Sequence, residues 1–170
     1  IRQRYMEQGV LTEEQIESCL SNTLVFDKCE PVTLYNKDIK IPPISENPKE
    51  EFKQLLNSQW KKLRDNYPKE RHKEYLQAIR EEQKIISDTN MEEYFLMDYK
   101  ICKVGREKYN AVISGTGRGS AGSFFLNTLL EILNMDRLDS PVTLYPTRFM
   151  SVSRILETKS LPDEYTSLHI

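Results

Sequence analysis

The glycines of this chain are concentrated in one short segment, and that segment constrains the fold more than any other feature. Four of the six glycines lie within residues 115–122, whose sequence is Gly-Thr-Gly-Arg-Gly-Ser-Ala-Gly. A β-prone run, Asn110–Ser114, precedes the segment, and an apolar run, Ser123–Met135, follows it. Glycine permits φ > 0 and close backbone approach, so the pattern predicts a tight turn between a short strand and a buried helix.

This glycine turn is a candidate phosphate site. The start of a helix leaves backbone N–H groups unpaired, and the aligned peptide dipoles favour an anion there. Arg118 adds a planar guanidinium that matches phosphate oxygens, and Ser120 supplies a hydroxyl or a helix cap. A turn that only joins a strand to a core helix is the alternative interpretation.

Two common nucleotide-binding motifs do not fit the turn. The segment Gly117–Gly122 matches G-x-G-x-x-G, but a Rossmann unit places this turn after its first strand and ends its second strand on an acidic residue. Here a long helical stretch comes first, and Asp136 and Asp139 precede the next candidate strand, Pro141–Tyr145. The P-loop is disfavoured as well, because no Gly-Lys-Ser/Thr follows a four-residue spacer.

The rest of the chain is predicted to be mainly helical. Residues 1–30 form one or two short helices, with Thr12 as a start signal, and the four prolines of residues 31–48 predict an extended linker. Apolar residues at three- and four-residue spacing predict amphipathic helices over about 49–67, 69–87 and 91–108. We interpret the charged residues of the middle helix, Glu82 included, as a solvated face.

Composition limits the class of protein. Apolar residues make up 38% of the chain, charged residues 29%, and the formal net charge is −2, which disfavours a dedicated basic DNA-binding domain. No apolar run approaches the roughly 20 residues that span a bilayer. The three cysteines form no CxxC pair, so we expect reduced thiols and a cytoplasmic location. The chain starts at Ile1 without a methionine or a leader and stops abruptly, so we expect a fragment.

Several short motifs follow one another in an order that resembles the palm of the C-family replicative DNA polymerases, the bacterial-type polymerase III alpha subunits. Order and spacing agree over residues 49–163 through Tyr94-Phe95-Leu96, Gly117–Ser123, Asp136-Arg137-Leu138, Arg148-Phe149-Met150 with Arg154, and Leu161-Pro162-Asp163. Upstream, Leu20-Ser-Asn22-Thr23 resembles a helix near the end of the PHP domain of that family. The resemblance covers most of the chain and implies a helical remnant of a PHP-like domain (1–30), a Pro-rich linker (31–48) and a partial palm (49–170).

The resemblance implies an α+β fold, in which a helix-rich N-terminal part precedes an incomplete nucleotidyltransferase palm of the polymerase beta type, with a small sheet and packed helices. The implied cofactor is Mg²⁺ in a two-metal site, and the implied partners are dNTP, primer–template DNA and other replisome subunits such as a sliding clamp. Asp163 would be the catalytic carboxylate and metal ligand. The residues implied to bind the nucleotide are Gly117, Arg118, Gly119, Ser120, Ser123, Arg148 and Arg154.

One position departs from the family pattern. Two-metal phosphoryl transfer needs clustered carboxylates, and in a strand Asp-x-Asp presents both to one side. Here Asp163 is followed by Glu164, which would face the opposite side, and by Tyr165, where the second Asp is expected. A diverged or inactivated palm, an altered chain end, or a register shift that uses Glu164 would each explain this.

Under all three explanations we expect this chain alone not to polymerise DNA, whereas the full-length protein would be a DNA-directed DNA polymerase. The alternatives are a non-catalytic nucleotide- or DNA-binding module derived from a palm, or a helical interaction scaffold whose glycine turn is only structural.

Overall fold

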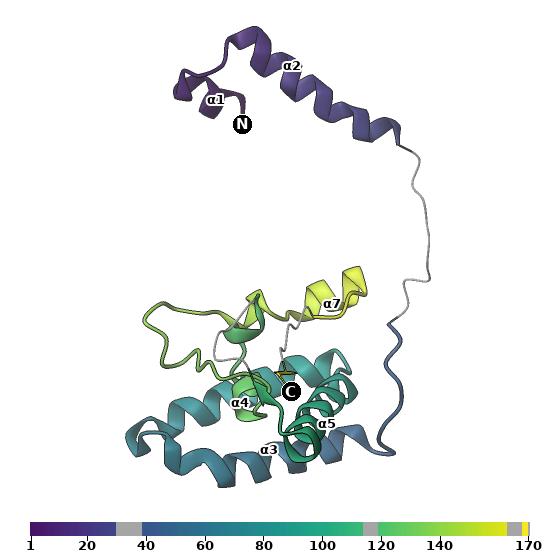
Figure 1. Ribbon diagram of the computed structural model, residues 1–170, viewed down its shortest axis with the longest axis vertical. Coiled ribbons are helices and arrows are strands. Elements are labelled where there is room, and N and C mark those ends of the chain that lie inside the picture. The colour runs from purple at the N-terminus through teal and green to yellow at the C-terminus, as the bar shows by residue number, and fades with distance from the viewer. Residues whose placement is uncertain (30–38, 114–118, 163–167, 170) are drawn as a thin grey trace. The chain divides into compact units, whose positions relative to one another are not determined.

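The computed structural model describes residues 1–29, 39–113, 119–162 and 168–169 (Figure 1). The chain divides into two compact units, Ile1–Asn36 and Lys37–Ile170. The division falls in the Pro-rich segment predicted to be a linker, of which residues 31–38 lie outside the described part. The domain boundaries expected from the sequence therefore stay predictions.

The first unit contains two helices, α1 (Arg2–Gln8) and α2 (Glu13–Thr23), and a 3₁₀ turn at Leu24–Lys28. The start of α2 is a capping box: the Gln15 N–H donates to Thr12 Oγ1 at 3.2 Å, and the Thr12 N–H donates to Gln15 Oε1 at 2.9 Å. The start signal predicted at Thr12 is confirmed.

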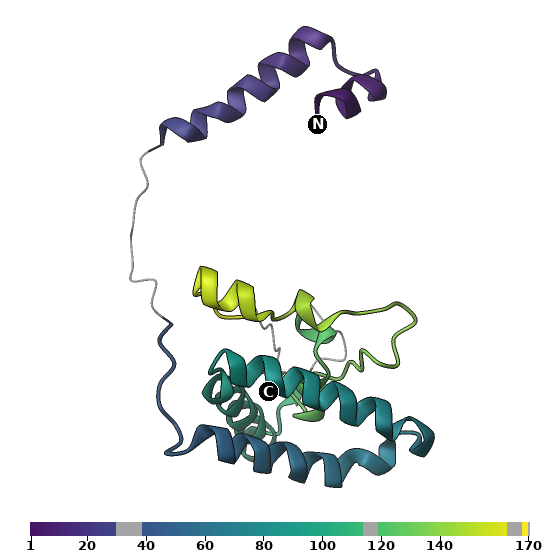
Figure 2. The same ribbon diagram turned by 180° about the vertical axis from the view of Figure 1, so that it is seen from behind.

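Three long helices form the frame of the second unit: α3 (Pro48–Leu63), α4 (His72–Asp88) and α5 (Glu92–Tyr109). Short 3₁₀ turns at Arg64–Asn66 and Lys69–Arg71 connect α3 to α4, and both views show these two helices side by side (Figures 1 and 2). Asn47 caps α3 by accepting from the Glu50 N–H, and Pro48 occupies its first turn. The three predicted amphipathic helices are confirmed.

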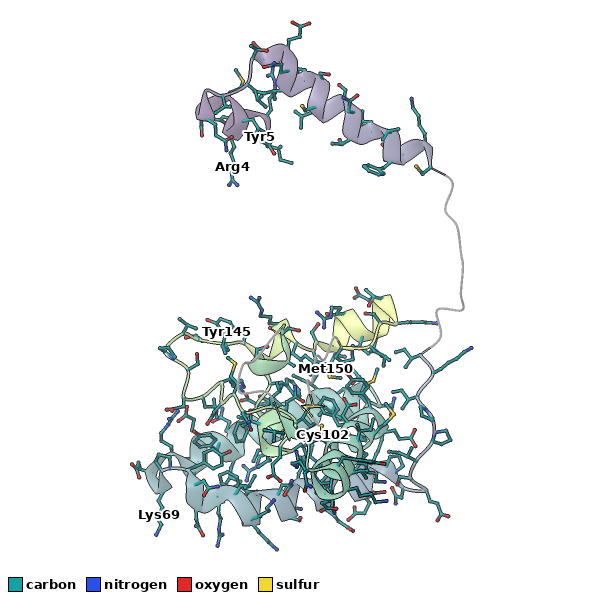
Figure 3. The ribbon with its side chains drawn as sticks, in the orientation of Figure 1. Arg4, Tyr5, Lys69, Cys102, Tyr145 and Met150 are labelled. Atoms are coloured by element: carbon teal, nitrogen blue, oxygen red, sulfur yellow. The ribbon has the colours of Figure 1, made fainter. Side chains whose placement is uncertain are left out.

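The core of the second unit is aromatic, and its rings come from several elements. The buried Phe95 ring of α5 lies 6.0 Å from Phe52 of α3, 6.0 Å from Phe124 and 6.3 Å from Phe149. Helix α5 packs on α3, and the short helix α6 (Phe125–Leu129) packs on both α3 and α4. Cys102 lies in this interior, whereas Tyr145 lies 65% exposed on a loop (Figure 3).

The apolar run predicted as one helix over 123–135 is buried as expected, but the predicted helix length is wrong. A 3₁₀ turn at Ala121–Ser123 precedes α6, which ends at Leu129. The carbonyl of Asn127 accepts from the N–H groups of Ile132 at 2.9 Å and Leu133 at 3.2 Å, which folds the chain back on itself. Glu131 takes a left-handed φ of 56°, so the helical hydrogen-bond ladder cannot continue.

The expected α+β palm with its small sheet is also wrong, because the unit is helical. Among the described residues the β structure consists of β1 (Val112–Ile113) paired antiparallel with β2 (Leu168–His169). Residues 141–145, a candidate strand in the sequence, form bends and irregular backbone, so that prediction is wrong. The predicted turn or short helix at 148–154 is present as a 3₁₀ turn at Pro146–Arg148 and helix α7 (Val152–Thr158).

Candidate nucleotide-binding site

The described part of the glycine turn begins at Gly119, since Gly117 and Arg118 lie outside the described residues. Gly119 has φ 72°, a left-handed conformation that costs an L side chain about 1–2 kcal/mol. It is exposed and Ser120 is half-buried, whereas Ala121–Ser123 are buried. The chain therefore passes from the surface into the core within three residues.

Hydrogen bonds on the inner side of the turn fix the orientation of its peptide groups. Ser123 Oγ donates to the Ser120 carbonyl at 2.6 Å, and the Ser123 N–H donates to the same oxygen at 3.0 Å. Asn127 Nδ2 donates to the Ala121 carbonyl at 3.0 Å. The Ser123 hydroxyl, a predicted phosphate contact, thus donates its proton within the turn.

These carbonyl contacts determine where the N–H groups of the turn point. In a trans peptide the C=O of one residue and the N–H of the next point in opposite directions. Because the carbonyls of Ser120 and Ala121 point toward their donors on Ser123 and Asn127, the N–H groups of Ala121 and Gly122 point away from these donors. Neither N–H has an acceptor among the described residues. The turn therefore carries two oriented amide donors.

The start of α6 is not open to an external anion, because a side chain from α4 already occupies it. The Phe125 N–H donates to Glu82 Oε1 at 3.0 Å, and the Leu126 N–H donates to Glu82 Oε2 at 2.8 Å. The start of this helix, where the sequence predicted a phosphate, is therefore already occupied, and the phosphate site itself stays a prediction.

Glu82 is fully buried, so its assignment to a solvated face was wrong. The sequence did contain a signal. Positions 75, 79, 82 and 86 share one side of a helix, and Tyr75, Ile79 and Ile86 form the buried face of α4. The periodicity therefore placed Glu82 inside, although its charge suggested a solvated position.

Arg137 completes the environment of Glu82. Its Nε donates to Glu82 Oε1 at 2.7 Å, and the Arg137 side chain is only 9% exposed. Burial raises the pKa of Glu82 to about 7, although the guanidinium of Arg137 and the two backbone N–H donors favour the ionised carboxylate. Sequence motifs singled out the Asp136-Arg137-Leu138 segment but gave no indication of this pairing.

The flanking residues of that segment are also hydrogen-bonded to α4 and to Arg71, the residue that directly precedes it. The Tyr75 hydroxyl donates to Asp136 Oδ2 at 2.7 Å, and Arg71 Nη2 donates to the Leu138 carbonyl at 2.6 Å. Burial, together with the hydrogen bond to the Asp136 carboxylate, raises the pKa of Tyr75 well above its ordinary value. The segment therefore connects the loop after α6 to α4 and the turn before it through side-chain hydrogen bonds.

The two predicted phosphate-binding arginines have different environments. The 3₁₀ turn that ends at Arg148 packs against the 3₁₀ turn Ala121–Ser123, and the Arg148 side chain is exposed, with no partner among the described residues. Arg154 is half-buried and its Nη2 donates to the Phe149 carbonyl. The Arg148 side chain is thus available to a ligand beside the glycine turn, whereas the Arg154 side chain is hydrogen-bonded to the loop that precedes α7.

Asp163 and Tyr165 lie outside the described residues, but neighbours on both sides are anchored. The Tyr94 hydroxyl donates to the carbonyl of the buried Pro162 at 3.0 Å. On the other side, β2 pairs with β1, which directly precedes the glycine turn. The structure thus connects the end of the chain to the strand that leads into the turn.

The described residues alone do not provide a magnesium site. No three His, Cys, Asp or Glu side chains in residues 1–29, 39–113, 119–162 and 168–169 lie close enough to hold a metal ion. The predicted two-metal site depends on Asp163, which is outside these ranges. None of the helices in the described part is long and apolar enough to cross a membrane.

In the described part of the chain, the helical second unit thus presents a glycine turn with two unpaired amides, and the turn that bears the exposed Arg148 packs against it. The chain belongs to the family of the bacterial DNA polymerase III alpha NTPase domain, whose family model matches residues 53–163. This family membership confirms the resemblance found in the sequence motifs.

Individual relatives agree with the family. The chain is 28% identical over 164 residues to DNA polymerase III subunit alpha of Staphylococcus aureus strain COL, an alignment that covers 90% of this chain and 14% of that protein. It is 31% identical over 117 residues to the corresponding subunit of Ureaplasma parvum, covering 69% of this chain and 11% of that protein. The chain thus spans a small part of the length of these relatives. No solved structure matches it.

Proposed function

We propose that this chain is the part of a replicative DNA polymerase alpha subunit that holds the triphosphate of the incoming dNTP. One observation carries the proposal: the N–H groups of Ala121 and Gly122 lack an acceptor among the described residues, and the turn bearing Arg148 packs beside them. Backbone amides and a guanidinium are the donors that proteins use for phosphate oxygens.

Each part of the site would have a distinct task. The N–H groups of Ala121 and Gly122 and the Arg148 guanidinium would bind phosphate oxygens, and the left-handed Gly119 would let the nucleotide approach the backbone closely. Arg118 would add a second cation from the same turn. Mg²⁺ would enter with the nucleotide and lower its charge, and Asp163 is the predicted protein ligand for it.

Chain extension itself belongs to the larger protein in this proposal. Primer–template DNA and other replisome subunits such as a sliding clamp would be partners of that protein. This chain would supply binding and orientation of the triphosphate, which brings the reacting phosphorus to the primer terminus.

Calorimetric titration of the chain with Mg·dATP tests the proposal. Removing a hydrogen bond to a charged group costs roughly 1.5–3 kcal/mol, so Arg148→Ala should weaken binding about tenfold to a hundredfold. Arg80→Ala is the matched control, because Arg80 is an exposed arginine of α4. Absence of binding to the wild-type chain, or equal affinities for the two variants, would contradict the proposal.

Tyr165 motivates a second candidate function, a nucleotide-binding module that has lost catalysis. The family pattern has a carboxylate at this position, and a phenol is a poor ligand for Mg²⁺, which prefers carboxylate and phosphate oxygens. Tyr165→Asp in the longer protein separates the two candidates. A gain in primer extension favours the polymerase, and no gain favours the non-catalytic module.

A further inference from the structure

We infer that Glu82 is a positioning residue for the glycine turn: the carboxylate, paired with Arg137, fixes the start of α6 and thereby the orientation of the amides that face the ligand. The inference rests on the proposed function, since it assigns a role within the same site. Glu82 itself is buried and lies on the inner side, so it does not contact the nucleotide.

The contact between Glu82 and α6 is bidentate. Its two carboxylate oxygens accept from successive backbone N–H groups, those of Phe125 at 3.0 Å and Leu126 at 2.8 Å. Two bonds from one rigid carboxylate fix both the position and the direction of the helix start, which a single bond would not. Ser120, directly before the 3₁₀ turn, gives no side-chain cap, so Glu82 supplies the side-chain acceptor that α6 lacks from its own segment.

The start of α6 and the glycine turn form one hydrogen-bonded unit. The Asn127 side chain, fully buried in α6, donates to the Ala121 carbonyl, and the Phe124 N–H donates to the same oxygen at 3.2 Å. Asn127 Oδ1 has no hydrogen-bond partner among the described residues, so the bond from Nδ2 to the Ala121 carbonyl is the hydrogen bond that the structure records for this side chain. A shift of α6 would therefore rotate the peptide group that orients the Gly122 N–H.

Charge makes the arrangement compatible with an anionic ligand. A buried carboxylate without a partner would repel a triphosphate bound near the outer side of the turn. Arg137, at 2.7 Å, balances the charge of Glu82, and two backbone N–H groups also donate to the carboxylate oxygens. The protein thus keeps its own anion at the helix start and leaves the amides of the turn for phosphate.

The test compares Glu82→Gln with Glu81→Gln. Both variants remove one negative charge from α4, but Glu81 is exposed, whereas Glu82→Gln places an amide NH₂ group opposite a backbone N–H in place of an acceptor oxygen. Circular dichroism first shows that both variants are folded. Two quantities are then measured at pH 8: the Mg·dATP affinity by calorimetry, and the backbone amide NMR shifts of Gly119–Gly122 without nucleotide.

We expect Glu82→Gln to weaken Mg·dATP binding at least tenfold and to move the turn amide resonances, and Glu81→Gln to do neither. A folded Glu82→Gln chain with unchanged affinity and unchanged resonances overturns the inference. If Glu82→Gln does not fold, Glu82→Asp replaces it: the charge beside Arg137 is kept, but the shorter side chain withdraws from Phe125 and Leu126, and the same losses are expected.

The two readouts separate this inference from the proposed function. Absence of Mg·dATP binding to the wild-type chain contradicts the proposed function, whatever the variants do. In that case the nucleotide-free resonances still decide whether Glu82 positions the turn. Unchanged affinity with shifted resonances would show that Glu82 orients the amides but that nucleotide binding does not depend on them, and this also overturns the inference.

Discussion

Raising the pH from 4 to 8 should lower the free energy of unfolding of the wild-type chain relative to that of Glu82→Gln. In the unfolded chain the Glu82 carboxyl ionises near its ordinary pKa of 4.5, whereas in the folded chain burial raises its pKa to about 7. Between these values the folded state binds more protons than the unfolded state. The stabilisation is therefore complete below pH 4.5 and is lost as the pH rises to 7.

The size of the effect follows from the same two pKa values. Each pKa unit corresponds to about 1.4 kcal/mol, so a rise from 4.5 to about 7 is worth about 3 kcal/mol. The full shift applies because the side chain is completely buried and little screened by solvent. Burial outweighs the opposing influence of Arg137 and the backbone donors in this balance.

Urea unfolding of both chains at half-unit pH steps between 4 and 8.5 measures the effect. The glutamine introduced by Glu82→Gln does not titrate, so subtracting the two stability curves cancels the other ionisable groups. The free energy of unfolding of the wild-type chain minus that of Glu82→Gln should fall by about 3 kcal/mol up to pH 7 and then level off. A difference that stays flat or rises with pH would refute the reasoning, because it would show that the contacts with Arg137, Phe125 and Leu126 keep the carboxylate ionised.

Three further substitutions, one of them with a matched control, test the structure. Phe95→Ala should cost about 3–5 kcal/mol in urea unfolding, because the ring is fully buried among other rings, while Ile101→Ala, at a 53% exposed position, should change stability by less than about 0.5 kcal/mol. Arg154→Ala should cost about 1 kcal/mol by leaving the Phe149 carbonyl without its donor, and an unchanged unfolding midpoint would contradict this. Gly119→Ala should cost about 1–2 kcal/mol by thermal unfolding, since φ is 72°; a neutral effect would exclude the left-handed conformation.

The long helices could be predicted because local periodicity determines them. The apolar residues of α3 and α4 recur at three- and four-residue spacing, and Asn47 with Pro48 marks the start of α3. These signals lie within the segment that they describe. The existence and approximate extent of these helices therefore followed from the sequence, but not their boundaries: Pro48, assigned to the linker, opens α3, which ends at Leu63 and not at about residue 67.

The apolar segment after the glycine turn shows that local sequence patterns can predict burial without predicting where a helix ends. Burial of residues 124–133 was predicted correctly, but the helix ends at Leu129 because the Asn127 carbonyl accepts from Ile132 and Leu133. A run that is apolar on all sides gives no periodicity to mark its end. The expected palm sheet failed for a related reason, since it came from family resemblance and needs pairing between distant segments, which no local pattern specifies.

The candidate site was predicted in part. The sequence indicated Gly119, Ser120 and Arg148, and the structure packs the 3₁₀ turn that ends at Arg148 against the 3₁₀ turn that follows Ser120. It did not indicate that Glu82 and Arg137, far apart in the chain, would form a buried pair behind this site. Such pairs depend on tertiary packing.

Backbone hydrogen exchange at Ala121 and Gly122 tests the central claim most directly. These two N–H groups are oriented away from the inner hydrogen bonds of the turn and have no acceptor among the described residues, so a bound triphosphate should slow their exchange. We predict protection of both amides by dATP in the presence of Mg²⁺, and less protection in excess EDTA. Exchange at both amides that is the same with and without saturating Mg·dATP would contradict the claim that the glycine turn holds the nucleotide.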